Sequence, residues 1–269
     1  MPESILRFER VTVSFDGNPA LEDVTFDLPE GESRVILGAA GSGKTVMLKA
    51  CLGLVCPEKG SVFLFGEDIT NLKEEQLFKL RARTGMLFQE SALFDSLTIE
   101  ENVAYPLENQ QRDQRPPEEL RPVVEEILRS VELENTLEKL PSELSGGMRR
   151  RVGIARANVT KPDLVLYDSP TAGLDPITAN TIMALIVMER DLRKATTMIV
   201  TQRFQDGQIM ARYRYDPAAR QVVRATRDGG EVGGIRFMVL KDGRLVFEGT
   251  LQELEQSTDP YISQFVLRH

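Results

Sequence analysis

Histidine is almost absent from this sequence: the one copy is His269, the last of 269 residues. Because histidine is the side chain whose ordinary pKa lies nearest to neutral pH, we expect no imidazole inside the fold to act as a general base. Cysteine is nearly as scarce. Cys51 and Cys56 lie five positions apart beside apolar neighbours, a spacing that fits neither a zinc site nor a disulfide framework. We expect both to be buried thiols.

Long apolar runs are missing as well. No uncharged apolar stretch approaches the roughly 20 residues that a membrane-spanning helix needs. The opening segment, MPESILRFERVTV, carries charges where an export signal needs a continuous apolar core. We therefore expect a soluble chain that reaches a membrane only through a partner. The formal net charge of -8 disfavours a general nucleic-acid binder, which must neutralise phosphates with lysine and arginine.

Strand-like and helix-like segments alternate along the chain. The runs ILRFERVTVSF and ALEDVTFDL, separated by the turn DGNP, predict two antiparallel strands. The apolar runs SRVIL, GMLFQ, DLVLYD and TTMIVTQ predict further strands, and a helix over 177–194 separates the last two. Strand, helix and strand at this spacing indicate parallel strands with crossover helices. The pattern predicts an α/β core.

Two segments depart from this alternation within what we predict to be a single domain, 1–269. Residues 116–132 begin with prolines and repeat apolar residues at helical spacing, so we expect a helical subdomain inserted at about 90–160. Residues 203–269 contain the turn signals DP, GG and DG, which predict β-hairpins, followed by a final helix in LQELEQ.

The stretch GAAGSGKT, Gly38–Thr45, follows a predicted strand and precedes a predicted helix, as the phosphate-binding P-loop does. The backbone N–H groups of such a loop face the phosphates, and the helix start favours their negative charge. Lys44 reaches the terminal phosphates, Thr45 can ligate Mg²⁺, and Asp168 at the end of LVLYD is expected to hold the same ion. The nucleotide-binding residues are therefore Gly38, Ala39, Ala40, Gly41, Ser42, Gly43, Lys44 and Thr45.

A second possible anion site lies at LSGGM. Ser145 can cap the following helix, and Gly146 and Gly147 leave its N–H groups bare. The alternative is a helix cap with no ligand. Because one nucleotide has little use for two separate cradles in one chain, this loop could serve the nucleotide of a neighbouring chain.

The segments GAAGSGKT, LSGGM, LVLYD and AGLDP, in this order and spacing, resemble the ATP-binding subunit of ABC transporters over nearly the whole chain. The resemblance implies ATP and Mg²⁺ as ligands and a P-loop nucleotidase core with an antiparallel β subdomain and a helical insert. It also implies that Gln89 contacts Mg²⁺ and water and that Phe15 stacks on adenine. Core packing of Phe15 and a surface position of Gln89 remain the alternatives.

Such subunits work as head-to-tail pairs. The resemblance places each ATP between the P-loop of one chain and Ser145, Gly146 and Gly147 of the other, with Asp175 at the dimer interface. A different ATPase subunit could take the place of the second copy.

A narrower resemblance joins MLFQESALFDSLTIEENVAYPL, LPSELSGGM and LDPIT to the ATPase subunit of MCE-linked phospholipid transporters. It implies an integral membrane permease and an MCE-domain protein as partners, and a cytoplasmic chain at the inner face of the inner membrane. A soluble ABC factor without a permease is the alternative. The sequence shows neither the second ATPase domain nor the long coiled coil that such factors usually carry.

Two positions depart from the family pattern: Ser169 stands where the family has the glutamate general base, and Gln202 where it has a histidine. Serine cannot take the proton of water as a carboxylate does, and losing a general base removes about 10²–10⁴ of rate. Gln202 can hydrogen-bond the γ-phosphate but cannot carry an imidazolium charge. We expect tight ATP binding and slow turnover.

Four explanations of these two residues stay open. The chain is a slow homodimer that uses Gln89, Asp175 and water in another way, or it pairs with a competent subunit. It is a scaffold that dimerises on ATP, or the two residues are deliberate substitutions that trap the ATP-bound state.

Overall fold

The computed structural model describes residues 4–109, 116–225 and 230–266. His269 lies outside these residues. Cys51 is buried as expected, whereas the expectation for Cys56 is wrong because its side chain is exposed.

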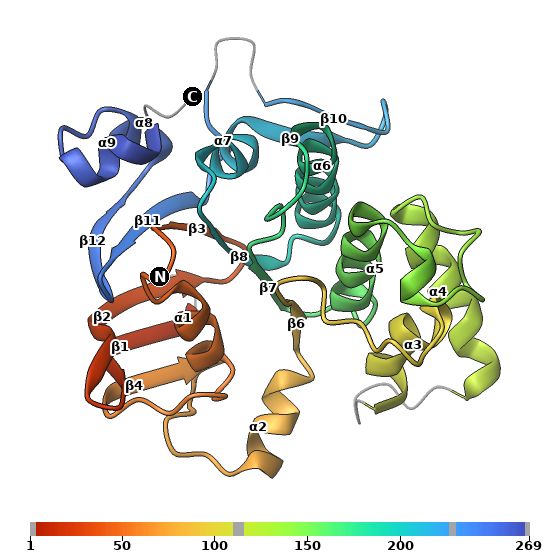
Figure 1. Cartoon of the computed structure of the whole chain (residues 1–269), viewed down its shortest axis with the longest axis horizontal. Helices are drawn as coiled ribbons and strands as arrows, with labels where there is room; N and C mark the ends of the chain where they lie inside the picture. The colour runs from red at the N-terminus through yellow and green to blue at the C-terminus, as the bar shows by residue number, and fades with distance from the viewer. Residues whose placement is uncertain (1–3, 110–115, 226–229, 267–269) are drawn as a thin grey trace.

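The central sheet has the strand order β12-β11-β3-β8-β7-β6, and all neighbours are parallel except the β11–β12 hairpin. The predicted mostly parallel α/β core is therefore confirmed (Figure 1). Its strands are β3 (Ser33–Leu37), β6 (Thr84–Leu87), β7 (Leu164–Asp168), β8 (Thr196–Thr201), β11 (Ile235–Lys241) and β12 (Arg244–Gly249).

A second sheet, antiparallel, has the order β2-β1-β4-β5. It packs on the central sheet together with α1 (Lys44–Cys51). Its strands are β1 (Ser4–Phe15), β2 (Asn18–Pro29), β4 (Lys59–Leu64) and β5 (Glu67–Asp68). This sheet is the predicted antiparallel subdomain.

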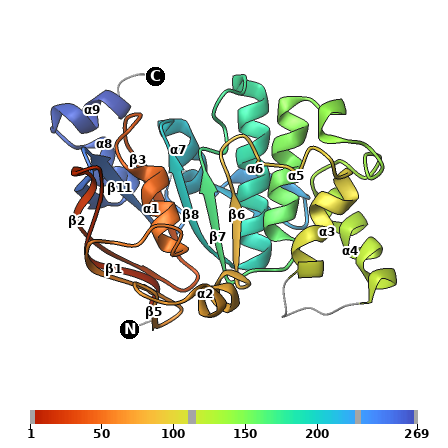
Figure 2. The same cartoon turned by 60° about the horizontal axis from the view of Figure 1, so that its bottom comes forward.

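Successive side chains of the central strands point to opposite faces of the sheet, and each face carries an apolar core. In β7, Leu164 and Leu166 face α1 and the antiparallel sheet, whereas Val165 and Tyr167 face the opposite side, because successive strand side chains point to opposite faces. The opposite core is closed by α6 (Pro176–Arg193), α7 (Phe204–Arg212), α8 (Leu251–Glu255) and α9 (Pro260–Val266). Figure 2 shows α1 and α6 on opposite sides of these strands.

The helical insert has its own apolar core, formed mainly by α3 (Ile99–Asn109), α4 (Pro117–Ser130) and α5 (Gly146–Asn158). A short 3₁₀ turn, Pro141–Glu143, leads into α5, and α2 (Glu74–Arg81) lies beside β6. The predicted helix over 116–132 corresponds to α4, and the one over 177–194 to α6.

The chain after Gln202 differs from the prediction of hairpins and one helix. It begins with α7, continues into the hairpin of β9 (Tyr213–Asp216) and β10 (Gln221–Arg224), and ends in two helices. The strand β11 pairs with β12 as a hairpin but also extends the central sheet by parallel pairing with β3.

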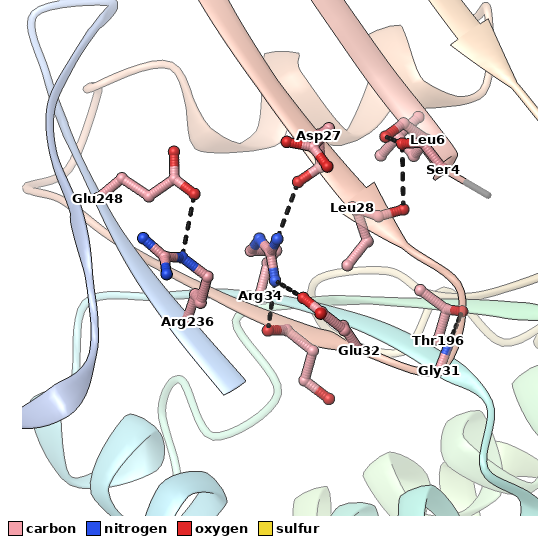
Figure 3. A network of polar contacts seen from close by, with 11 residues as sticks. Ser4, Leu6, Asp27, Leu28, Gly31, Glu32, Arg34, Thr196, Arg236 and Glu248 are labelled. Atoms are coloured by element: carbon pink, nitrogen blue, oxygen red, sulfur yellow. Dashed lines mark hydrogen bonds and ion pairs between the residues drawn. The ribbon is translucent and has the colours of Figure 1, made fainter. Parts of the chain in front are cut away.

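Buried polar bonds join the two sheets at the end of β3 that is remote from the P-loop (Figure 3). The guanidinium of Arg34 donates to the carbonyl oxygen of Asp27 on β2 at 3.0 Å and to the carboxylate of Glu32 at 2.8 Å. Nearby, the Gly31 N–H donates to the hydroxyl of Thr196 on β8 at 2.9 Å. These contacts fix the antiparallel sheet against the central strands.

Candidate functional site

The P-loop connects the end of β3 to the start of α1, and its glycines are required by close backbone approach. A Cβ atom on Gly38 would lie 2.4 Å from the hydroxyl oxygen of Ser42 and 2.5 Å from the carbonyl oxygen of Leu240. Gly43 has φ +102°, and a Cβ there would lie 2.3 Å from the carbonyl oxygen of Ala20. The loop is therefore tight enough to bring its N–H groups to a phosphate.

Lys44 is buried at the first turn of α1, and its ammonium turns back onto the loop. Nζ donates to the carbonyl oxygens of Gly38 at 2.9 Å and Ala39 at 2.7 Å, and to the Ser42 hydroxyl at 3.2 Å. Burial lowers the pKa of Lys44 to about 8, and the nearby charge of Asp168 opposes this shift. A bound phosphate would supply an anionic partner for this ammonium.

Both carboxylate oxygens of Asp168 accept hydrogen bonds from hydroxyl groups. Thr45 donates to Oδ2 at 3.0 Å, and Ser169 donates to Oδ1 at 3.1 Å, while Asp168 is only 2% exposed. The structure therefore brings Thr45 and Asp168, two of the predicted Mg²⁺ ligands, within hydrogen-bonding distance of each other. Ser169 has φ +49°, so its left-handed backbone turns its side chain toward the carboxylate.

The oxygen donors of Thr45 and Asp168 fit Mg²⁺, which is bound through one or two carboxylates together with phosphate oxygens in nucleotide sites. Among the described residues, no three His, Cys, Asp or Glu side chains cluster as a dedicated metal cage. Thr45 and Asp168 would hold a metal that arrives with a nucleotide. The metal would orient the phosphates and offset their charge.

A cavity of about 360 Å³ brings eight of the seventeen predicted site residues together. Its wall combines the P-loop with the polar side chains of Gln89, Ser169 and Gln202. Among the described residues, no carboxylate, imidazole or thiol lines this cavity. Ser169 and Gln202 therefore face the same space as Lys44 and Thr45.

Asp206, which sequence reasoning missed, anchors the loops that carry Ser169 and Gln202. Its Oδ2 accepts hydrogen bonds from Thr171 at 2.6 Å and from Thr201 at 2.7 Å, and its side chain is 1% exposed. Burial raises its pKa, and the two threonine hydroxyls oppose the shift. The sequence signal for this role is weak, because Asp206 is simply an acidic residue in the first turn of α7.

The LSGGM segment, Leu144–Met148, lies apart from this cavity in the same chain. The Ser145 hydroxyl caps α5 by accepting from the Met148 N–H at 3.2 Å, and Gly146 is exposed. Gly147 packs so closely that a Cβ would lie 2.6 Å from Cγ2 of Thr178 on α6. This exposed helix start is available to a ligand outside the chain's own P-loop site.

Asp175 caps α6 by accepting from the N–H groups of Ile177 and Thr178, both at 3.0 Å. Hydrogen bonds from Thr178 lower the pKa of Asp175. Phe15, at the end of β1, is 49% exposed and lies outside the cavity wall. Neither residue contacts the predicted phosphate site within one chain.

Two further residues that sequence reasoning missed touch the motif loops. Arg150 on α5 is buried and donates to the carbonyl oxygens of Phe88 at 3.5 Å and Ala172 at 3.3 Å, and so links the segments beside Gln89 and Ser169. The Tyr261 hydroxyl on α9 accepts from the P-loop N–H of Ala39 at 3.1 Å and donates to Leu240 at 3.2 Å.

The sequence pattern of the ABC transporter family matches residues 21–172, more than half of the chain. The chain belongs to the ABC transporter family. Its fold is that of an ABC cassette, and membership makes it an ATP-binding protein. Among the described residues, no helix is both long and apolar enough to cross a membrane.

Relatives and a solved structure show how far the likeness extends. A probable ribonucleotide transport ATP-binding protein, mkl, of Mycobacterium leprae is 40% identical over 75% of this chain, which spans only 58% of that relative. The intermembrane phospholipid transport ATP-binding protein MlaF of Haemophilus influenzae is 30% identical over 99% of this chain and 91% of its own length. A dimeric structure of the ATP-binding cassette MJ0796 with ADP and phosphate matches with TM-score 0.77 and 31% identity, over 91% of this chain and 98% of the cassette.

Proposed function

We propose that this ABC protein is the ATP-binding subunit of a transporter that moves phospholipid through a membrane permease, at the cytoplasmic face of the inner membrane. The likeness to MlaF along nearly the full length of both chains supports this substrate class. An MCE-domain protein is the expected further partner. On this proposal the chain itself contacts ATP, Mg²⁺, a second ATPase subunit and the permease, and the permease contacts the lipid.

The observation that carries the nucleotide part of the proposal is the shared cavity. Lys44, Thr45 and Gln89 line this cavity, and Asp168 accepts a hydrogen bond from Thr45, which supports binding of Mg·ATP there. Phe15 on the exposed end of β1 is the proposed adenine platform. Ser145, Gly146 and Gly147 complete the site of the second subunit, and Asp175 lies at the interface between them.

The hydrolytic step of the proposed ATPase is slow. Ser169 is bonded to Asp168, has no charge and cannot accept a proton from water at neutral pH, and Gln202 cannot supply a charged imidazole. The electrostatic groups that bind the phosphates remain. This combination favours a long-lived ATP-bound dimer, as in a slow homodimer, an ATP-gated scaffold, or a heterodimer whose competent site is completed by this chain's Ser145–Gly147.

The test compares phosphate release by the assembled complex with that of the Ser169→Glu, Gln202→His double variant. We expect the two proteins to have Mg·ATP dissociation constants within about threefold of each other. We expect turnover at least about 10²-fold faster in the variant, because a general base contributes about 10²–10⁴ to the rate. Equal and fast turnover of both proteins would refute the slow-hydrolysis part. Purification of the native complex without a multispanning membrane protein would refute the transporter part.

A further inference from the structure

A further cavity, of about 410 Å³, lies between α6, α7 and the β9–β10 hairpin, elements that contact one another beside the central sheet (Figure 1). Its volume is within the range of small-molecule sites. Every residue of its wall comes after position 172, where the match to the family pattern ends. None of these residues lines the P-loop cavity, so the two cavities are separate.

The wall of this cavity is cationic, although the whole chain has a net charge of -8. Of the side chains that the structure describes, no carboxylate lines it. Its polar groups are two guanidiniums, three carboxamides and one phenol, from Arg212, Arg224, Asn180, Gln205, Gln208 and Tyr213. Guanidinium groups bind phosphate and carboxylate through paired N–H donors, and carboxamides offer both donors and acceptors. This combination favours a small organic anion over a cation or an apolar ligand.

The two arginines are held in different ways. One terminal nitrogen of Arg212 donates to both carboxylate oxygens of Glu255 on α8, at 2.8 and 2.7 Å, and Gln208 donates to the same carboxylate at 3.1 Å. These bonds orient Arg212 and Gln208. Arg224 is exposed, forms no ion pair with any described residue, and has its guanidinium 6.0 Å from the centre of the Tyr213 ring. Arg224 therefore supplies a charge that a bound anion would balance.

The hairpin wall is fixed to α6 by buried bonds. Arg190 on α6 is 7% exposed and donates to the carbonyl oxygens of Met210 at 2.6 Å and Tyr213 at 2.9 Å. The neighbouring Asp191 accepts from the N–H of Tyr215 on β9 at 2.7 Å. A site on elements that are already fixed loses less conformational freedom when a ligand binds. The cavity is therefore preformed.

The same helices hold the loops of the nucleotide site. Asp206, in the first turn of α7, anchors the loops that carry Ser169 and Gln202. Its neighbour Gln205 lines the further cavity, as does Asn180 on α6. A ligand that bridges α6 and α7 restrains these loops where they line the P-loop cavity. A nucleotide that binds to loops already restrained pays less entropy, and the effect is reciprocal.

We propose that this cavity is a regulatory site for a small organic anion that carries a phosphate or a carboxylate group. The anionic group pairs with Arg224 and Arg212, and the carboxamides bind the rest of the molecule. Occupancy of the site raises the affinity of the P-loop for nucleotide. This inference goes beyond the proposed function, because the site requires neither the permease nor a lipid.

The test uses the purified full chain with its P-loop filled by the Mg²⁺ complex of a non-hydrolysable ATP analogue, which keeps the probes out of that loop. Calorimetric titrations with AMP and with citrate separate a phosphate source from a carboxylate source. We expect a dissociation constant below about 1 mM for one of the two. Arg224→Gln should weaken that binding at least about tenfold, a ratio typical of a lost charge-assisted bond.

Arg214→Gln is the matched control. Arg214 is exposed on the same strand as Tyr213, but as its direct neighbour it points to the opposite face and does not line the cavity. It removes the same charge from the same hairpin, and we expect it to change the probe's affinity less than about twofold, as for an exposed charge without a partner. Ala184→Leu fills the cavity without removing a charge and should abolish the binding.

The coupling is measured in the reverse direction. The bound probe should tighten binding of the ATP analogue to the chain at least about fivefold, and Arg224→Gln should remove this effect. Unchanged melting temperatures of the variants exclude misfolding. Absence of binding by both probes, equal losses in Arg224→Gln and Arg214→Gln, full binding by Ala184→Leu, or an unchanged affinity for the analogue would overturn the inference. None of these outcomes concerns the permease, so the proposed transporter function is tested separately.

Discussion

Replacement of Asp206 is a strong test of how the site loops are held. The carboxylate bonds Thr171, two residues after Ser169, and Thr201, one residue before Gln202. Asp206→Ala leaves both threonine hydroxyls without this acceptor in a region closed to water, and an unpaired buried polar group costs about 1–3 kcal/mol. Burying a charged carboxylate has a cost of its own, which the substitution removes. We therefore expect a net loss of about 2–4 kcal/mol in the free energy of unfolding.

Asp206→Asn is the matched variant because its amide oxygen can accept both hydroxyls. It removes the buried charge and places an amide near the position of Oδ1, which has no hydrogen-bond partner in the described structure. We expect stability at pH 7 equal to or above that of the wild type. The assay is urea unfolding of the purified chain, followed by circular dichroism, with and without Mg·ATP.

The sign of the pH dependence follows from the raised pKa of Asp206. The folded state holds the proton more tightly than the unfolded chain, whose carboxyl has the ordinary value of 3.8. Stability contributed by this proton is complete below that value and is lost as the pH rises through the higher, folded pKa. The Asn variant lacks this contribution, so its advantage over the wild type should shrink on acidification. An advantage that grows at low pH, or an Ala variant as stable as wild type, would refute the reasoning.

Two smaller predictions concern close contacts of the motif loops. Gly147→Ala should lower the free energy of unfolding by about 1–2 kcal/mol, because the added Cβ would lie 2.6 Å from Cγ2 of Thr178. Thr178→Ser removes that methyl group. The double variant should therefore regain most of the lost stability in an unfolding experiment. Tyr261→Phe removes the acceptor of the Ala39 N–H. We expect a free energy of unfolding about 1 kcal/mol lower, and a Mg·ATP affinity, measured by calorimetry, that is severalfold weaker. Unchanged affinity would show that α9 does not position the P-loop.

Local patterns in the sequence were sufficient for the P-loop, the main strands and most of the helical insert. A strand, a glycine-rich loop and a helix follow one another within a few residues at Gly38–Thr45, so no distant contact is needed to recognise them. The meeting of Thr45 with Asp168 was predictable for a related reason: both residues follow parallel strands, whose carboxyl ends lie at one edge of the sheet.

Elements whose stability comes from distant contacts were not predicted. Helix α7 contains Gly207, which disfavours a helix by about 1 kcal/mol relative to alanine. In the fold this glycine lets α7 approach β11 so closely that a Cβ would lie 2.5 Å from the ring of Phe237. The strand β11 pairs in parallel with β3, a segment some two hundred residues away. The turn between β11 and β12 predicts only their hairpin, so the pairing with β3 could not be predicted from local sequence. One of the two hydrogen bonds of Asp206 likewise comes from a distant residue, Thr171.

The geometry around Asp168 bears on the proposed slow hydrolysis through the residue at position 169. A glutamate there would add a second negative charge beside Asp168, whereas the Ser169 hydroxyl donates a hydrogen bond to it at 3.1 Å. On the proposed function, Ser169 therefore donates to the proposed Mg²⁺ ligand without adding a negative charge beside it, and it offers no proton acceptor to water. On this proposal the site favours the ATP-bound state over turnover, because the residue that bonds the metal ligand leaves the attacking water without a base.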